Sequence, residues 1–150
     1  MSPLRIGDRA PAIPGISFGD GPVGLFFYKI TCPTCQLAAP KMAAFERLAP
    51  GRVIGVGQDP LPELGRFAET HAIGIASVED PPPYVVSDAY DIVSVPTLYL
   101  IEGDGTVADV VGAWERDGFN RVAASLARSV GAAPVEVSSP DDGLPAFQPG

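Results

Sequence analysis

Apolar and polar residues change their spacing along the chain, and each change predicts a new element. Residues 23–28 (VGLFFY) are almost entirely apolar, which is typical of a strand covered on both faces of a sheet. From Pro33 the apolar residues recur at helical spacing, with Ala38, Met42 and Phe45 on one face. The first part of the chain therefore predicts a buried strand that leads directly into an amphipathic helix.

The same alternation continues in the middle of the chain. Residues 53–56 (VIGV) predict a second short buried strand, and a second helix begins at Asp59, with Leu61 and Leu64 on its inner face. The three consecutive prolines at 81–83 exclude regular structure at that point. We expect a break in the pattern there.

The remaining elements are a short strand, a hairpin and a final helix. Residues 84–86 predict the short strand. Residues 97–101 and 106–111 predict the two strands of the hairpin, joined by a turn at 103–105 (GDG). The final helix is predicted over 115–130. Strands that alternate with helices and end in a hairpin describe an α/β layered domain.

The composition changes after the last predicted helix. Residues 1–131 form one predicted domain, a length that buries a sizeable core without metals or disulfides. Residues 132–150 are rich in Pro, Ser and Asp, a composition that favours a mobile tail. We therefore expect one domain followed by a flexible C-terminal segment.

Charge and hydropathy exclude several classes of partner. The net charge is −8 and the isoelectric point is near 4.4, so the protein repels nucleic acid phosphates and anionic lipid surfaces. No apolar run approaches the roughly 18 residues of a membrane-spanning helix. The first residues do not resemble a signal peptide. As written, the chain is expected in the cytoplasm, or outside it if an export signal was removed.

The two cysteines of the chain lie at the joint between the first strand and the first helix, in the stretch TCPTCQ at residues 31–36. Unpaired N–H groups and the helix dipole favour an anion at a helix amino end, and thus the thiolate of Cys32. Lys29 could add positive potential. Cys35, one turn into the helix, is expected to be less exposed.

This arrangement predicts thiol-disulfide exchange. Cys32 would attack a disulfide and form a mixed disulfide, and Cys35 would resolve it. The second step is intramolecular because of the short spacing, and is therefore fast. The reverse reaction oxidises a dithiol, so the reduction potential decides the direction.

Three other readings of the cysteine pair are weaker. A disulfide across two residues closes a very small loop and stabilises the fold little. A zinc site needs four ligands, and the chain adds only His71, so we expect no metal and no other cofactor. Two inert buried thiols are the third alternative.

Three features make the chain resemble the thioredoxin superfamily, over most of its length to about residue 131. They are CPTC at 32–35, the helix proline Pro40, and the Val-Pro-Thr element at 95–97 before a late strand. Within the superfamily the chain is most similar to the TlpA/ResA-like, AhpC/TSA-related branch. That branch is matched by IGDRAPAIPG at 6–15 and by the strand and helix that begin at Val53.

The resemblance implies a thioredoxin-like fold, with a central mixed sheet flanked by helices, an N-terminal extension and an inserted strand-helix element. It also implies that Pro96 is cis and that the backbone of Val95 pairs with a bound substrate chain. The expected substrate-binding residues are Thr31, Pro33, Thr34, Val95, Pro96 and Thr97. The expected partners are protein disulfides or dithiols and a separate electron donor or acceptor.

The chain departs from the family pattern at acidic positions. Thioredoxins carry a buried acid where this chain has Phe26, and some relatives carry a Glu where it has Ala38. We therefore expect proton transfer at Cys35 to use water or another group. The competing functions are a peroxiredoxin-like peroxide reductase that uses Cys32 and a redox-silent interaction module.

Overall fold

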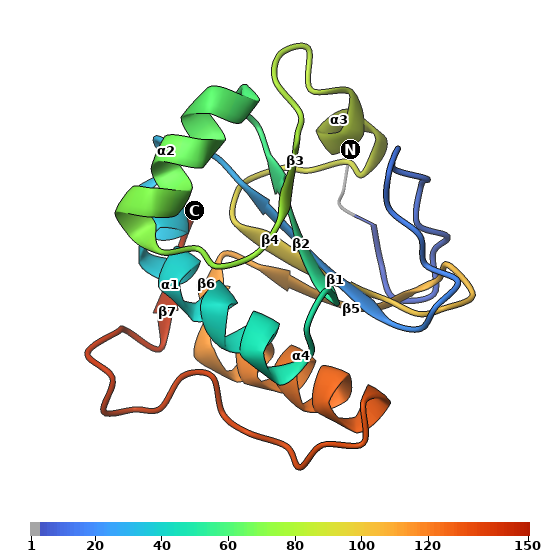
Figure 1. The fold of residues 1–150 in the computed structure, drawn as a ribbon, viewed down its shortest axis with the longest axis vertical. Helices are drawn as coiled ribbons and strands as arrows, with labels where there is room; N and C mark the ends of the chain where they lie inside the picture. Colours follow the sequence, from blue (N-terminus) through green and yellow to red (C-terminus); the bar gives the residue numbers. More distant parts are fainter. Residues whose placement is uncertain (1–3) are drawn as a thin grey trace.

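The computed structural model describes residues 4–150, in which strands and helices alternate as far as the third helix and are followed by three consecutive strands, a last helix and a short final strand (Figure 1). The strands are β1 (Val23–Tyr28), β2 (Val53–Gly57), β3 (Ser77–Glu79), β4 (Thr97–Ile101), β5 (Val107–Gly112), β6 (Trp114–Glu115) and β7 (Phe147–Gln148). The helices are α1 (Pro33–Leu48), α2 (Leu61–His71), α3 (Val85–Ala89) and α4 (Arg116–Ser129). Within the described residues no helix has the length and hydropathy needed to cross a bilayer.

The main sheet has the strand order β3-β2-β1-β4-β5. β1 lies at its centre, parallel to β2 and antiparallel to β4. All six residues of β1 are buried, which explains its apolar sequence because both of its faces are covered. The loop that carries both cysteines therefore begins at the carboxyl end of the central strand.

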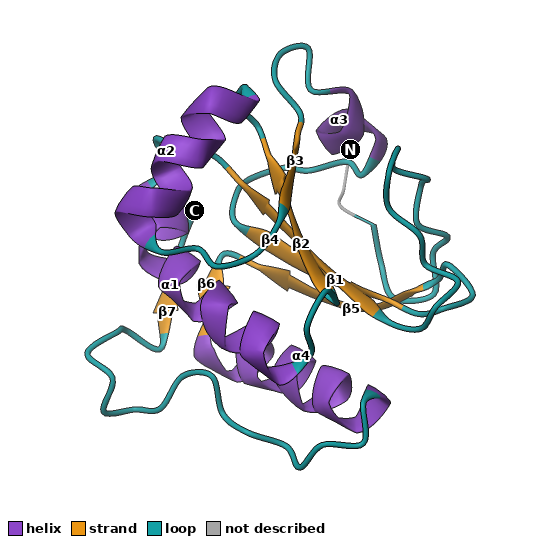
Figure 2. Ribbon diagram, in the orientation of Figure 1, coloured by secondary structure: helices purple, strands orange, loops and turns teal. Residues whose placement is uncertain are grey.

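Helices cover the two faces of this sheet unequally (Figure 2). α1, α2 and α4 pack with Phe26 and Tyr28 into one hydrophobic core. On the opposite face, α3 and the N-terminal segment cover Leu25 and Phe27. The N-terminal extension is tied to the β5 end of the sheet, since the N–H of Gly7 donates to the carbonyl of Val107 at 2.8 Å. This layered α/β arrangement confirms the predicted fold class.

Most of the predicted elements are confirmed to within one or two residues, and one is wrong. The predicted strand at 84–86 is instead the start of α3. The buried carboxylate of Asp80 accepts hydrogen bonds from the N–H groups of Val86 and Ser87, at 2.9 and 2.7 Å. A carboxylate in this position satisfies the free donors of a first helical turn.

Two further details differ from the sequence pattern. β3 lies before the three prolines, and its three residues are only partly covered at the sheet edge, so it has no recognisable apolar run. Leu61, expected on the inner face of α2, has 53% of its surface exposed. It is the first residue of α2 and projects beyond the core contacts made by Leu64 and Phe67.

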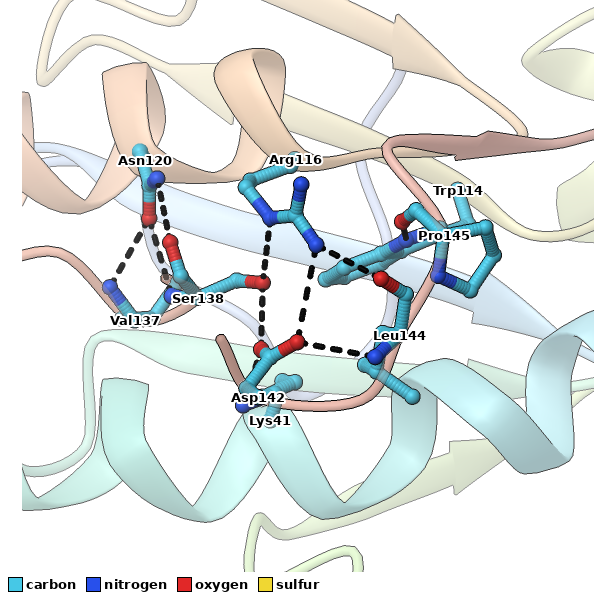
Figure 3. Close-up of polar contacts among 9 residues, drawn as sticks. All are labelled: Lys41, Trp114, Arg116, Asn120, Val137, Ser138, Asp142, Leu144 and Pro145. Atoms are coloured by element: carbon cyan, nitrogen blue, oxygen red, sulfur yellow. Dashed lines mark hydrogen bonds and ion pairs between the residues drawn. The ribbon is translucent and has the colours of Figure 1, made fainter. Parts of the chain in front are cut away.

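The C-terminal segment (residues 132–150) returns along α4 and α1 and ends near the amino end of α1 (Figure 1). Asn120 of α4 holds its first half, since the side-chain oxygen of Asn120 accepts the N–H groups of Val137 and Ser138 at 2.8 and 3.0 Å (Figure 3). Val137 and Ser138 are both buried. The segment thus has an ordered packing site in the structure, while its mobility in solution stays a prediction.

A cluster of charged groups, the Asp142 cluster, fixes the middle of this segment (Figure 3). The carboxylate of Asp142 lies 2.8 Å from Lys41 Nζ and 3.5 Å from Arg116 Nη2. It also accepts the hydroxyl of Ser138 at 2.6 Å. The hydrogen bond from Lys41 above all, and then those from the Ser138 hydroxyl and the Leu144 N–H, hold the pKa of Asp142 well below its usual range.

We expect Asp142→Asn to loosen the C-terminal segment, because the amide keeps the shape but removes the charge that Lys41 and Arg116 neutralise. Limited proteolysis at neutral pH should cut the variant several times faster within residues 132–150. The matched control is Asp141→Asn, which makes the same chemical change at an exposed neighbouring position.

The depressed pKa of Asp142 also determines how the packing of residues 132–150 depends on pH. The ionised form of Asp142 stabilises the packed segment above the ordinary carboxyl pKa of about 3.9, and this contribution is lost progressively as the pH falls below it. The difference in cleavage rate between the wild type and Asp142→Asn should therefore become smaller in acid. Equal cleavage of the wild type and both variants at neutral pH would contradict the role of the cluster.

Candidate active site

The loop between β1 and α1 is held by hydrogen bonds on both sides. The N–H of Ile30 donates to the carboxylate of Asp59 at 2.9 Å. The side chain of Gln36 donates to the carbonyl of Ile30 at 2.9 Å. The N–H of Cys32 donates to the carbonyl of Lys29 at 3.2 Å. These bonds fix the approach to α1 and therefore the position of the first cysteine.

Cys32 is the N-cap residue of α1, and Pro33 is the first residue of the helix. The N–H of Cys35 donates to the sulfur of Cys32 at 3.1 Å. Pro33 is well suited to the first helical position because its missing N–H would have no partner there. The sulfur of Cys32 thus occupies the place of a capping oxygen and receives the field of the helix amino end, as the sequence predicts.

The two cysteines differ in their surroundings. Cys32 is partly exposed, whereas Cys35 has no exposed surface. Burial is the largest influence that raises the pKa of the Cys35 thiol, followed by its hydrogen bond with Cys32. Cys35 is therefore held as a neutral thiol, and Cys32 is the sulfur that solvent can reach.

The Val-Pro-Thr element lies beside Cys32. The Val95–Pro96 bond is cis, as the family resemblance implies. The thiol of Cys32 donates to the carbonyl of Val95 at 3.5 Å. Phe27 of β1 pairs with Thr97 of β4 in an antiparallel register, so the end of β1 and the start of β4 meet at one edge of the sheet.

The other predicted site residues have different surroundings. Thr31 and Pro33 are exposed, while Thr34 and Thr97 are buried. The Thr97 hydroxyl donates to the carbonyl of Ser94 at 2.8 Å, so it is occupied inside the loop. The Thr34 hydroxyl is in contact with the C-terminal segment, as described below. Of these four residues, Thr31 and Pro33 are therefore the two that face solvent beside the dithiol.

Lys29 is held on Tyr84 rather than free in solvent. Its ammonium donates to the Tyr84 hydroxyl at 3.0 Å and lies 5.1 Å from the centre of that ring. The hydrogen bond to Tyr84 is the main reason why the pKa of Lys29 is raised. Lys29 therefore keeps its positive charge at the base of the loop.

An acidic residue that the sequence pattern did not predict, Asp59, lies at the site. Burial is the main cause of the raised pKa values of Tyr28 and Cys35, and the negative charge of Asp59 adds a smaller contribution to each. The sequence does contain a signal for it: Asp59 follows β2, and β2 runs parallel to β1. Because parallel strands end at the same edge of a sheet, an acid after β2 lies near a dithiol after β1. The expectation that no carboxylate lies near Cys35 is thus wrong.

The C-terminal segment is also part of the site, which sequence analysis missed. The Thr34 hydroxyl donates to the carbonyl of Pro149 at 2.6 Å. The side-chain amide of Gln148 donates to the same hydroxyl at 2.9 Å. Thr34 and Pro149 lie 115 positions apart in the sequence, and local spacing cannot predict that two such distant residues are in contact. No sequence signal therefore pointed to these contacts.

Several solved structures that are similar to this chain are named as disulfide oxidoreductases or disulfide interchange proteins. The thioredoxin domain of a thiol-disulfide oxidoreductase from Bacteroides vulgatus has a TM-score of 0.65 and 21% identity, over 85% of this chain and 96% of that one. The dsbF protein of MTB has a TM-score of 0.59 and 26% identity, over 70% and 80%. A secreted disulfide oxidoreductase of Mycobacterium tuberculosis has a TM-score of 0.55 and 21% identity, over 63% and 70%.

No curated protein sequence matches the chain. The model of the AhpC/TSA family matches residues 17–110, a range that covers more than half of the chain and contains the dithiol and the Val-Pro-Thr element. The fold of the similar structures and the position of the dithiol agree with this match. The protein therefore belongs to the AhpC/TSA family and has a thioredoxin-like fold.

Proposed function

We propose that the protein is a thiol-disulfide oxidoreductase that exchanges its Cys32–Cys35 dithiol with disulfides in protein substrates. One observation carries the proposal: a partly exposed sulfur caps a helix and accepts the N–H of a second, buried cysteine at 3.1 Å. An exposed nucleophile with a buried partner in reach is what a two-step exchange requires. The disulfide chemistry of the similar structures supports it.

The first step is attack by the Cys32 thiolate on one sulfur of the substrate disulfide. A bond forms between Cys32 and that sulfur, and the second substrate sulfur leaves as a thiolate that takes up a proton. The N–H of Cys35 stabilises the negative charge on Cys32 before the attack. Thr31 and Pro33, exposed on either side of Cys32, would contact the incoming chain.

In the second step the Cys35 thiol gives up its proton to water and attacks the sulfur of Cys32. The mixed disulfide breaks, the first substrate sulfur leaves as a thiolate that takes up a proton from water, and the Cys32–Cys35 disulfide forms. Two electrons have then passed from the protein to the substrate. Burial above all, and then the hydrogen bond with Cys32, keep Cys35 protonated, which prevents it from competing with Cys32 for the first attack.

The substrate groove, in this proposal, lies between the dithiol and the cis-proline loop. Val95, Pro96 and Thr97 form one wall, and Val95 presents its carbonyl to the sulfur of Cys32 at 3.5 Å. Thr31, Pro33 and Thr34 form the other wall. A separate electron donor or acceptor completes the cycle, and the reduction potential of the dithiol sets its direction.

The compartment of the protein is also a proposal. The sequence as written predicts the cytoplasm, whereas one similar protein is described as secreted. Cytoplasmic thiols are kept reduced, so a reductant role fits that compartment and an oxidant role fits an exported form. Fractionation of the native host, with detection by a specific antibody, distinguishes the two.

We expect iodoacetamide to modify Cys32 in the folded, reduced protein at neutral pH. Cys35 should react at least ~100-fold more slowly, because it is buried and its raised pKa removes the reactive thiolate. Peptide mass spectrometry over a time course measures both rates. Unfolding in urea at higher pH, as the control, should make the two rates similar. Comparable labelling of both cysteines in the folded protein would argue against their assigned roles.

We expect Cys35→Ser to accumulate mixed disulfides with substrate proteins, since the resolving step is lost while the attack by Cys32 remains. Cys32→Ser is the matched control and should trap none, because the remaining cysteine is buried. Capture from a lysate of the native host, followed by non-reducing electrophoresis and release with dithiothreitol, provides the measurement. The absence of trapped proteins and of any insulin reduction would favour the redox-silent module.

Membership of the AhpC/TSA family makes peroxide reduction the second candidate. A peroxidase oxidises its thiol with hydrogen peroxide orders of magnitude faster than an ordinary thiol does. We expect the wild type to lose thiol slowly under hydrogen peroxide, since the second cysteine and the cis-proline loop beside Cys32 favour exchange with disulfides. A fast loss of thiol, followed in a stopped-flow instrument, would replace the proposed reaction by peroxide reduction.

A further inference from the structure

The end of the C-terminal segment lies in the groove that the proposed function assigns to the substrate. β7 pairs with β6 in an antiparallel register, with Gln148 opposite Trp114. This pairing brings the Gln148 side chain to the hydroxyl of Thr34, 2.9 Å away. The same hydroxyl donates to the carbonyl of Pro149 at 2.6 Å. One wall of the groove is thus already in contact with a polypeptide chain.

The last residue touches the opposite wall. Gly150 packs against the backbone of Val95 and Pro96 so closely that a Cβ atom on Gly150 would overlap the Val95 carbonyl. This is the carbonyl that accepts the thiol of Cys32. Residues 147–150 therefore bridge the two walls of the groove, and they bury Thr34, which lies between the two cysteines in the sequence.

We propose that residues 147–150 are a built-in occupant of the substrate groove, which an extended polypeptide has to displace before Cys32 reaches its disulfide. The inference rests on the proposed function, because it concerns the substrate of that same site. The contacts to Thr34 and Val95 involve the backbone at Pro149 and Gly150. A groove that contacts the main chain accepts extended segments of many sequences. The substrate class is thus an extended polypeptide with a small residue against Val95.

The segment is held upstream, so only its end needs to move. The indole N–H of Trp114 donates to the carbonyl of Pro145 at 2.7 Å (Figure 3). The backbone N–H of Arg116 donates to the carbonyl of Ala146 at 3.0 Å. The Asp142 cluster holds the residues before them. A tethered occupant acts at an effective concentration on the order of millimolar. Weak polypeptide ligands would therefore be excluded and tighter ones admitted.

The test uses full-length variants that displace the end of the segment. Gly150→Ala places a methyl group against the Val95 carbonyl, and Gln148→Ala removes the donor to Thr34. The control is Val135→Ala, an exposed position of the same segment with no contact to the groove. The first readout is the rate at which fluorescein maleimide labels Cys32, which depends on access and not on catalysis. The second is the reduction of insulin in the presence of dithiothreitol.

If the occupant is seated about 90% of the time, its displacement raises the apparent affinity for insulin about tenfold. The labelling rate rises by a smaller factor, because Cys32 is partly exposed while the segment is seated and only the bulk of fluorescein maleimide is obstructed. The double variant should show the largest effect, and Val135→Ala should behave as the wild type. A synthetic peptide AFQPG, added at millimolar concentration, should restore protection in the double variant. Equal labelling rates in the wild type and the displaced variants overturn the inference.

The two readouts separate this inference from the proposed function. Faster maleimide labelling of the variants, together with no insulin reduction by any form of the protein, supports the occupant and overturns the exchange reaction. Insulin reduction by the wild type with labelling rates that the variants do not change supports the reaction and overturns the occupant. Thermal unfolding of each variant verifies that the increased labelling does not come from loss of the fold.

Discussion

The hydrogen bonding of β1 between β2 and β4 is the constraint on which the site depends. The parallel pairing brings the end of β2 beside the end of β1, and the antiparallel pairing brings the start of β4 to the same edge. Asp59, Cys32 and Val95 come from three separate parts of the chain and meet there only for this reason. A shift of either register by one residue would turn the side chains of β1 to the other face and separate the groups.

The difference between the two sulfurs follows from the same placement. Cys32 stands at the boundary between loop and helix, where backbone donors remain free, and Cys35 lies one turn deeper against the core. One helix amino end thus combines a backbone donor to a partly exposed sulfur with the burial that keeps its partner a neutral thiol. Asp59 and Lys29 add charged groups near this strand-to-helix joint.

The core of the fold and the dithiol were predictable because their signals are local. The apolar run in β1, the helical period of α1 and the CPTC stretch each lie within a few residues of sequence. The placement of α3 depends on the buried Asp80 carboxylate, and the position of Asp59 depends on strand pairing, so both need tertiary information. The C-terminal segment was the least predictable part. Its polar and proline-rich composition is that of a free tail, yet Lys41, Arg116 and Asn120 supply partners for its polar groups in the structure.

The single indole of the chain has a consequence for how the segment can be observed. Trp114 is fully buried, packs on Phe119 with ring centres 4.7 Å apart, and donates its N–H to Pro145. Indole emission responds to hydration, and Gln148 pairs with Trp114 across β6 and β7, so movement of residues 147–150 alters the emission of the one tryptophan without any attached dye. The protein thus carries an intrinsic optical reporter of the end of its C-terminal segment.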